Sequence, residues 1–336
     1  MHVHGFDVKG CAGFPLSWHS VAIWPENGYI AKVFPEQTLH DMKKILITVV
    51  MALVAVSASA QFESFTRGMT KEQKRAFGIQ VADTIKVWPG GTPSAYEAPA
   101  GSFSSAFSEA LIEAYPASKP NGLAVIICPG GGYLFEMQSY EGRDMAAWFN
   151  ARGIDFYMLQ YRLPFGKYTT APLEDARQAV RIVRSLGRAK KIGIMGCSAG
   201  GHLASTLATH YTADSRPDFQ VLFYPVITMD PTYTHIGSRD ALLGNNPSAE
   251  LTDLYSNEKQ VTADTPPAFI MGSTDDDTVP VRNFVNYYLA LLDNGVSATM
   301  HLYPSGGHGW GFKDDFIYKS SWTSELERWL SEVIMK

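Results

Sequence analysis

Apolar and polar positions follow two rhythms along the chain from about residue 120 onward. Short runs of apolar and β-branched residues are separated by longer segments in which apolar residues recur every three or four positions. The short runs predict buried strands, and the longer segments predict helices. We expect strands at residues 123–128, 155–161, 191–195, 219–224, 268–272 and 298–303, and helices at residues 141–152, 172–186, 199–210, 281–294 and 322–334.

Glycine follows three of the predicted helices, at Gly153, Gly187 and Gly295. A glycine directly after the last apolar position of a helix is typical of a helix C-terminus. Strands that alternate with helices through short connections indicate βαβ units and a parallel sheet. The predicted fold class is therefore α/β, a mostly parallel central sheet flanked by helices, in a single domain over residues 61–336.

Two segments lack a clean period. Residues 61–120 are a mixed segment rich in glycine, proline and serine, and residues 226–267 separate two predicted strands by a long connection. We expect this connection to be a polar excursion over the C-terminal edge of the sheet. Its charged residues are Asp230, Arg239, Asp240, Glu250, Asp253, Glu258, Lys259 and Asp264.

The pattern near the N-terminus is that of a secretory signal peptide. Met42 and two lysines precede the uncharged run at residues 45–56, and Ala58-Ser59-Ala60 then precedes Gln61. A positive start, a short apolar run and an A-x-A site are what a signal peptidase requires. The run is shorter than the roughly 20 residues that span a bilayer. We therefore expect a signal peptide at residues 42–60, a non-native upstream extension at 1–41, no stable membrane insertion, and export to the periplasm or the medium.

The composition of the chain indicates which kind of molecule it binds. The chain has 336 residues, is 46% hydrophobic and 18% charged, and its 28 basic and 33 acidic residues give a net charge of −5. These values predict a globular protein and do not favour a nucleic-acid partner. The three cysteines, Cys11, Cys128 and Cys197, have neither C-x-x-C nor zinc-like spacing. We expect a small-molecule substrate, no cofactor and no metal; the oligomeric state is left open.

The predicted strand at 191–195 leads into Gly196-Cys197-Ser198-Ala199-Gly200 and then a predicted helix. This is G-x-S-x-G in the strand–turn–helix setting of a nucleophile elbow, where only small residues let the helix approach the strand. The alternative, a glycine-rich turn that grips phosphate, lacks both G-x-G-x-x-G and G-K-[ST]. Ser198 is the candidate nucleophile.

A serine nucleophile needs a histidine base that a carboxylate orients. His308 follows the last predicted strand within Gly306-Gly307-His308-Gly309, while Asp275, Asp276 and Asp277 follow the strand before it. Pro280 suits the first turn of the next helix, which favours Asp276 as the orienting acid and leaves Asp275 as its main competitor. The order Ser198, Asp276, His308 is that of the α/β-hydrolases. We expect His202 to be a packed or capping residue, His210 a helix C-terminal cation, and His301 part of a strand.

Consecutive glycines follow the first apolar strand in Pro129-Gly130-Gly131-Gly132. Their amide groups, unobstructed by side chains, suit an oxyanion hole. By analogy with the HGGG loop of esterases, Gly131, Gly132 and Ala199 are the predicted donors. The alternative is a tight turn without a catalytic role.

Several longer stretches carry a family resemblance. They are CPGGGY (128–133), Glu141-Gly142, YRLP (161–164), APLEDARQAVRIVR (171–184), GCSAGGHLAST (196–206), FYPVITM (223–229), GSRDALLG (237–244), TPPAFIMGSTDDDTVP (265–280) and LYPSGGHGWG (302–311). With them the chain resembles the bacterial α/β-hydrolase acetyl esterases related to acetylxylan esterases. The resemblance implies an α/β-hydrolase fold and an exported enzyme that deacetylates carbohydrate esters. It departs from the family at residues 271–274, where HTA or HGT is frequent.

The leading hypothesis is a serine esterase that acts on acetylated xylan or xylo-oligosaccharides through an acyl-enzyme. A prolyl-oligopeptidase-like peptidase shares the triad order but needs a propeller that this length cannot hold. A non-catalytic carbohydrate-binding relative would normally have lost a triad residue. Candidates for contact with sugar hydroxyls are Tyr133, His235, Ser238 and Arg239, and the alternative for each of them is ordinary packing within its loop.

Overall fold

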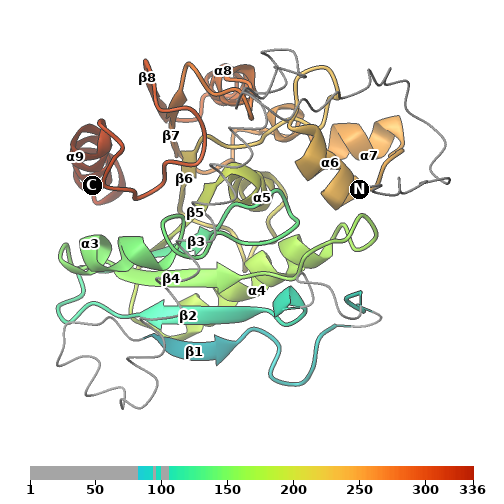
Figure 1. The fold of residues 1–336 in the computed structure, drawn as a ribbon. Helices are drawn as coiled ribbons and strands as arrows, with labels where there is room; N and C mark the ends of the chain where they lie inside the picture. Colours follow the sequence, from blue (N-terminus) through green and yellow to red (C-terminus); the bar gives the residue numbers. More distant parts are fainter. Residues whose placement is uncertain (1–81, 94–95, 100–105) are drawn as a thin grey trace, which may run out of the picture. The chain divides into compact units, whose positions relative to one another are not determined.

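The computed structural model describes residues 82–93, 96–99 and 106–336, and these form an eight-stranded sheet (Figure 1). The strand order is β1-β2-β4-β3-β5-β6-β7-β8. Strand β2 pairs antiparallel with both β1 and β4. All the other neighbouring strands, in the order β4-β3-β5-β6-β7-β8, pair parallel. The bounds are β1 Asp83–Lys86, β2 Leu111–Tyr115, β3 Leu123–Cys128, β4 Asp155–Gln160, β5 Lys191–Cys197, β6 Phe219–Phe223, β7 Ala268–Ser273 and β8 Ala298–Tyr303.

The six predicted strands correspond to β3–β8, with ends that differ by no more than two residues. Strands β1 and β2 lie in the segment that showed no period, so the interpretation of that segment was incomplete. Strand β1 is mostly exposed, and β2 is short and carries Glu113 at its centre. Neither sequence has the continuous apolar run of a buried parallel strand.

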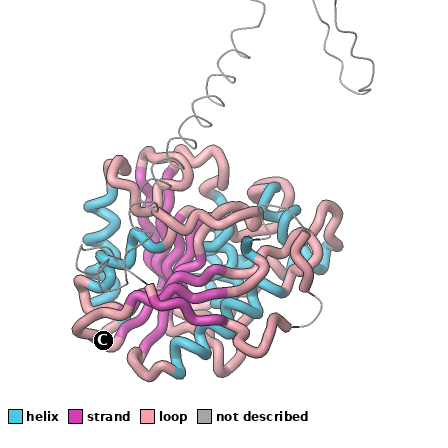
Figure 2. The backbone as a smooth tube through the Cα atoms, turned by 60° about the horizontal axis from the view of Figure 1, so that its bottom comes forward, coloured by secondary structure: helices cyan, strands magenta, loops and turns pink. Residues whose placement is uncertain are grey.

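Helices cover both faces of the sheet (Figure 2). Helices α4 (Ala171–Ser185), α5 (Ser198–Thr209) and α8 (Arg282–Asp293) share one apolar core, and α3 (Ala146–Asn150) and α9 (Lys319–Trp329) share the other. Strand β3 sends alternate side chains into each core, which is the period-2 pattern of a strand buried on both faces. Ala124, Ile126 and Cys128 face the first core, and Leu123, Val125 and Ile127 face the second.

Two predicted helices have different bounds. The helix expected at 141–152 is a 3₁₀ turn, Arg143–Met145, followed by the short α3, because Glu141 and Gly142 belong to the preceding loop. The helix expected at 322–334 begins earlier, as α9, and ends in a π-helical turn, Leu330–Ile334. Among the described residues, no helix has both the length and the apolar character needed to cross a membrane.

The polar connection after β6 is partly helical, although its sequence shows no clean period. It contains α6 (Ile236–Leu243), α7 (Ala249–Leu254) and a 3₁₀ turn, Asn257–Lys259. Side chains cap both α-helices: His235 accepts a hydrogen bond from the Ser238 amide, and Ser248 accepts one from the Leu251 amide. Such short helices depend on caps and tertiary contacts more than on an apolar period.

The described residues lie within one compact unit. The predicted upstream extension, 1–41, and the predicted signal peptide, 42–60, lie outside the described residues.

Candidate active site

Helix α5 begins at Ser198, directly after β5 ends at Cys197, and the backbone of Ser198 has a φ of 53°. This conformation is strained for a residue with a Cβ, and strain of this kind is a feature of functional turns. A Cβ on Gly196 would overlap the carbonyl oxygen of Gly200, and a Cβ on Gly200 would overlap the carbonyl oxygen of Cys128. The two glycines therefore allow the close packing that holds Ser198 at the carboxyl edge of the sheet.

A chain of hydrogen bonds joins three of the predicted site residues. Ser198 Oγ lies 2.8 Å from His308 Nε2, and His308 Nδ1 lies 2.7 Å from Asp276 Oδ2. An ionised carboxylate only accepts hydrogen bonds, so Nδ1 carries the proton in neutral His308 and Nε2 accepts from the serine hydroxyl. Asp276 and Ser198 are buried, with 9% and 6% of their surfaces exposed. The arrangement has the geometry of a nucleophile, its base and an orienting acid.

The three adjacent aspartates have different partners. Asp276 holds His308 with one oxygen, and its other oxygen accepts from the amides of Thr278 and Val279 at 3.0 and 2.9 Å. Asp275 instead accepts from the amides of Gly306 and Gly307 at 3.2 and 2.8 Å. Asp277 is exposed. Of the alternatives that the sequence left open, Asp276 is thus the one that contacts the imidazole, and Asp275 holds the loop on which His308 stands.

The glycine loop after β3 lies directly against Ser198. A Cβ on Gly130 would lie 3.0 Å from the Cβ of Ser198 and 2.9 Å from the carbonyl oxygen of Cys197. Gly131 and Gly132 have φ values of 129° and 67°, which residues with side chains rarely adopt. Within the described part of the chain, no group accepts a hydrogen bond from the amides of Gly131, Gly132 or Ala199. These three amides are available to a developing oxyanion beside Ser198.

Two buried residues behind the site, Glu141 and Tyr224, had no assigned role in the sequence analysis. Glu141 accepts from the Gly130 amide at 3.0 Å and from the Tyr224 hydroxyl at 2.8 Å. That hydroxyl also accepts from the Gly311 amide at 2.9 Å, and the Tyr224 ring packs edge-on to His308, with centroids 4.7 Å apart. Burial raises the pKa of Glu141, while the Tyr224 hydrogen bond and the charge of His308 oppose that rise. Glu141 thereby ties the glycine loop to the loop of His308. Glu141-Gly142 was noted only as part of the family resemblance, because a single acidic residue has no periodic signal.

A family model described as the alpha/beta hydrolase fold matches residues 125–312, which include every residue of this hydrogen-bonded chain. The chain belongs to the α/β hydrolase fold family. The predicted fold class and family are therefore confirmed.

Relatives of this hydrolase include an acetylxylan esterase and an endo-1,4-beta-xylanase. The chain is 39% identical over 223 residues to an acetylxylan esterase of Xylanibacter ruminicola. This match covers 64% of this chain and 46% of that protein. It is 37% identical over 221 residues to endo-1,4-beta-xylanase B of Butyrivibrio fibrisolvens, covering 59% of this chain and 34% of that protein. The chain thus spans less than half the length of these two relatives.

Among solved structures, an acetyl ester-xyloside bifunctional hydrolase from Caldicellulosiruptor lactoaceticus matches with a TM-score of 0.65 and 34% identity. The match covers 75% of this chain and 96% of that one. A sugar hydrolase from Lactococcus lactis matches with a TM-score of 0.59 and 26% identity, covering 67% of this chain and 95% of that one.

The hydrolase places the predicted sugar-contact residues differently from expectation. The Tyr133 side chain is 1% exposed, and its hydroxyl lies 2.9 Å from Nδ1 of the buried His202. The prediction that Tyr133 contacts sugar is therefore wrong for its side chain, which faces the core. His202 also contacts the Tyr255 carbonyl oxygen through Nε2 at 2.8 Å, and burial lowers its pKa to about 4. It is a packed histidine, as expected.

The other three candidates lie at the start of α6. Ser238 is buried, with its hydroxyl 2.7 Å from His235 Nδ1, so the prediction that it contacts sugar is also wrong. Arg239 donates to the Met229 carbonyl oxygen and pairs with Asp240 at 2.8 Å, which makes it a structural contact. His235 is partly exposed and its Cε1 lies 3.8 Å from the position of a Cβ on Gly132. Burial and the nearby His308 lower the pKa of His235. Ser238 Oγ lies equally close, 3.9 Å from the same Cβ position, but its residue is buried, so His235 is the one partly exposed candidate of the four that borders the site.

Among the described residues, no group of three or more histidine, cysteine, aspartate or glutamate side chains could hold a metal ion. The chemistry that the arrangement supports is nucleophilic attack by a serine on a carbonyl group.

Proposed function

We propose that this hydrolase is a serine carboxylesterase that removes acetyl groups from carbohydrate esters, namely acetylated xylan or xylo-oligosaccharides. The observation that carries the proposal is the hydrogen-bonded chain Ser198–His308–Asp276 beside the amides of Gly131, Gly132 and Ala199. Each role in ester cleavage has a group at the right place: a nucleophile, a base, an orienting acid and donors for the oxyanion.

In the first half of the reaction, Ser198 Oγ attacks the ester carbonyl carbon while His308 Nε2 takes the hydroxyl proton. The carbonyl oxygen becomes an oxyanion, which the amides of Gly131, Gly132 and Ala199 stabilise more strongly than they do the neutral ester. Collapse of this intermediate breaks the bond between the carbonyl carbon and the sugar oxygen. That oxygen takes the proton from His308, the sugar leaves, and Ser198 carries the acetyl group.

In the second half, water gives a proton to His308 Nε2 and attacks the acetyl carbonyl carbon. The second oxyanion collapses, acetate leaves, and Ser198 regains its proton from His308. Asp276 stays ionised throughout. It keeps the proton of His308 on Nδ1 and stabilises the imidazolium that forms twice in each cycle.

The substrate class is supported by two relatives, an acetylxylan esterase and an acetyl ester-xyloside hydrolase, and by the surface near the site. The neighbouring segment at α6 presents Arg239 and Asp240 in its first turns and Asn245 just after its end, beside one exposed apolar residue, Ile236. A lipase would need an apolar lid that buries a long acyl chain, at about 0.8 kcal/mol per methylene. The polar surface instead favours a short acyl group on a polar alcohol.

The test is a comparison of substrates with the purified mature protein. We expect kcat/KM to fall from p-nitrophenyl acetate to butyrate to octanoate, and acetate to be released from acetylated xylo-oligosaccharides. The Ser198→Ala variant should lose on the order of 10⁶ in kcat while folding normally, because a nucleophile is lost and almost no core area changes. A preference for octanoate, or no acetate from acetylated sugars, would overturn the carbohydrate-esterase proposal.

We also propose that the protein is exported. The support is the sequence pattern at residues 42–60, which lies outside the described residues. N-terminal sequencing of protein recovered from the periplasm or the medium should read from Gln61. A protein that begins at Met1, or that stays in the membrane fraction, would contradict both the cleavage site and the localisation.

A further inference from the structure

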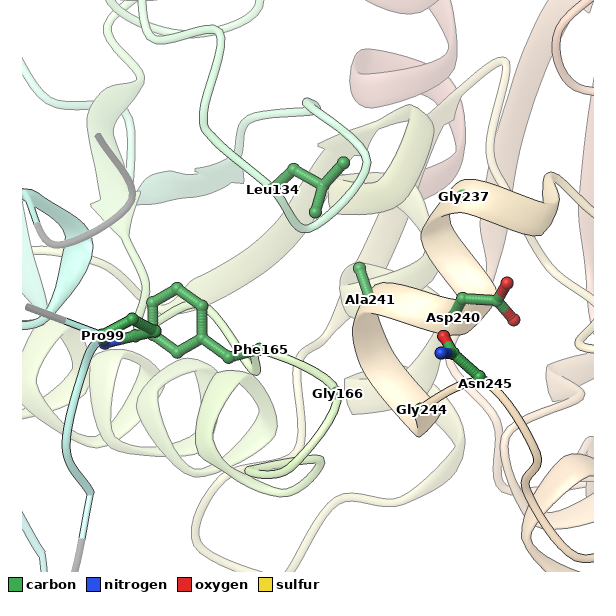
Figure 3. A pocket seen from close by; sticks show the side chains of 9 residues that line it. All are labelled: Pro99, Leu134, Phe165, Gly166, Gly237, Asp240, Ala241, Gly244 and Asn245. Carbon is green, nitrogen blue, oxygen red and sulfur yellow. The ribbon is translucent and has the colours of Figure 1, made fainter. Parts of the chain in front are cut away.

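An open pocket lies between α6 and the loop that follows β4. Its volume is about 630 Å³, within the range of about 300–1,000 Å³ that is usual for small-molecule sites. Figure 3 shows its lining: Phe165 and Leu134 come from two loops, and Asp240 and Asn245 come from α6 and the turn after it. We propose that this pocket binds the sugar part of the substrate, the alcohol that is released when the ester is cleaved. The inference rests on the proposed function.

The pocket adjoins the glycine loop and the His235 side chain, which border the candidate active site. Leu134, which lines it, is two residues beyond Gly132, and its amide donates to the Gly131 carbonyl oxygen at 3.0 Å. Gly237, on the opposite wall, is in the first turn of α6, and a Cβ on it would lie 3.2 Å from His235 Cε1. The same imidazole faces Gly132. A ligand in the pocket therefore lies next to the loop whose amides adjoin Ser198.

The lining has two chemically different sides. Phe165, Leu134 and Ala241 are apolar, whereas Asp240 and Asn245 carry hydrogen-bonding groups (Figure 3). A pyranose ring has the matching division, with C–H groups on its faces and hydroxyl groups at its edge. The ring can pack against Phe165 while its hydroxyls bond to the carboxylate and the amide.

The acyl group fits this pocket poorly. An acetyl methyl group needs far less space than the pocket offers, and a long acyl chain would cover the Asn245 amide and the Asp240–Arg239 ion pair without offering either a hydrogen bond, which is unfavourable. The sugar is therefore the part of the substrate that uses both sides of the pocket.

Several hydrogen bonds hold the walls in place before any ligand binds. The Gly166 amide donates to the Ala241 carbonyl oxygen at 2.5 Å, and Thr169 Oγ1 donates to the Leu242 carbonyl oxygen at 3.0 Å. Arg239 fixes the Asp240 carboxylate by its ion pair of 2.8 Å. Because these groups are already ordered, sugar binding loses little conformational entropy. Arg239 thus acts on the substrate only through Asp240.

The test uses unacetylated xylotriose as a probe of the pocket, with ethyl acetate as the substrate. Ethyl acetate is too small to fill the pocket, so its hydrolysis reports on the reacting groups. We expect xylotriose to inhibit competitively. Phe165→Leu, which keeps an apolar side chain and removes the aromatic face, should raise the inhibition constant about tenfold, and Asn245→Ala should raise it about fivefold through a lost hydrogen bond.

Asn246→Ala is the matched control, because Asn246 is also exposed and is absent from the lining of the pocket. It should leave the inhibition constant unchanged. Phe165 packs against the core, so the melting temperature of Phe165→Leu is measured as well. If Phe165→Leu is unstable, the test rests on Asn245→Ala, because Asn245 is exposed and its replacement leaves the core intact.

The pocket and the proposed function can fail separately. No inhibition of the wild-type enzyme by xylotriose, or equal inhibition constants for the wild type, Phe165→Leu and Asn245→Ala, would overturn the pocket assignment. Stronger inhibition by octanol than by xylotriose would do the same. Pocket-dependent inhibition without release of acetate from acetylated xylotriose would leave the sugar site standing and overturn the proposed substrate.

Discussion

The two walls of the candidate site are built differently. On the wall formed by strand ends, Ser198, His308 and Asp276 are largely buried, and backbone geometry and hydrogen bonds fix each of them. On the wall formed by α6 and the loop after β4, Phe165 and Asn245 are more exposed, and surface side chains define the shape. The difference indicates that chemistry here depends on backbone constraints, whereas substrate selection depends on side chains that can vary without disturbing the fold.

The largest effect that separates the walls should come from Asp276. In Asp276→Asn the amide nitrogen would face His308 Nδ1 and move the imidazole proton to Nε2, where it blocks removal of the serine proton. We expect kcat for p-nitrophenyl acetate to fall about 10⁴-fold. Asp275→Asn is the control: its amide oxygen still accepts from the Gly307 amide, so kcat should fall by about tenfold at most. Equal losses in the two variants would contradict the assignment of Asp276.

The strand-end wall should also be intolerant of added atoms. A Cβ on Gly200 would overlap the backbone carbonyl oxygens of Cys128 and Pro129, which have little freedom to move. Gly200→Ala should therefore lower the free energy of unfolding by about 3 kcal/mol in urea denaturation. Gly90→Ala, where a Cβ would meet nothing within 4 Å, should change it by no more than about 0.5 kcal/mol. Similar values for the two variants would show that close packing does not hold the serine turn.

The contrast between the walls also explains what the sequence could predict. The close packing around the site leaves no room for side chains at Gly196, Gly200 and the glycine loop, so these positions can be recognised as glycines in the sequence. The parallel strands can be recognised as apolar runs because both of their faces are buried. The serine, histidine and aspartate could be named for the same reason. The choice of Asp276 needed a register argument, which the hydrogen bond to His308 supports.

The other features of the fold and the site could not be predicted from the sequence, because they depend on contacts between residues that are far apart in the chain. Strands β1 and β2 are held at an antiparallel edge by pairing with a distant strand. Tyr133 follows the glycine loop and was a candidate for sugar contact, but its backbone has a φ of 61° and its side chain is buried in the core. Glu141 acts by joining two loops that are remote in sequence. None of these features leaves a periodic pattern.

Glu141 offers a smaller test of how the strand-end wall is held. Glutamine at this position can accept with one oxygen only, so either the Gly130 amide or the Tyr224 hydroxyl would lose its partner. We expect Glu141→Gln to lower kcat about 10- to 100-fold, with KM for ethyl acetate nearly unchanged, because the loops of the oxyanion donors and of His308 would shift relative to each other. Unchanged kcat would show that this bridge does not position the reacting groups.

The last expected effect is on stability rather than on kcat, and it concerns Glu136 in the loop that follows β3. Burial raises the pKa of Glu136 to about 8, and its carboxylate accepts from the Tyr161 amide at 2.7 Å. A carboxyl group with a raised pKa in the folded state contributes stability below its unfolded pKa and loses it as pH rises toward the folded value. Between pH 5 and 8 the free energy of unfolding of the wild type should therefore fall by about 3 kcal/mol relative to that of Glu136→Gln, which has no charge to bury. Parallel pH dependences of the two unfolding free energies would contradict this origin.

The most direct test of the central claim is covalent labelling of the nucleophile. The protein is inactivated with diethyl p-nitrophenyl phosphate, and the modified peptide is identified by mass spectrometry. We expect one phosphoryl group per chain on Ser198, formed in step with the loss of esterase activity, and no such label in Asp276→Asn over the same time. Inactivation with the label on another residue, or full activity after Ser198 is labelled, would contradict the assignment of Ser198 as the nucleophile.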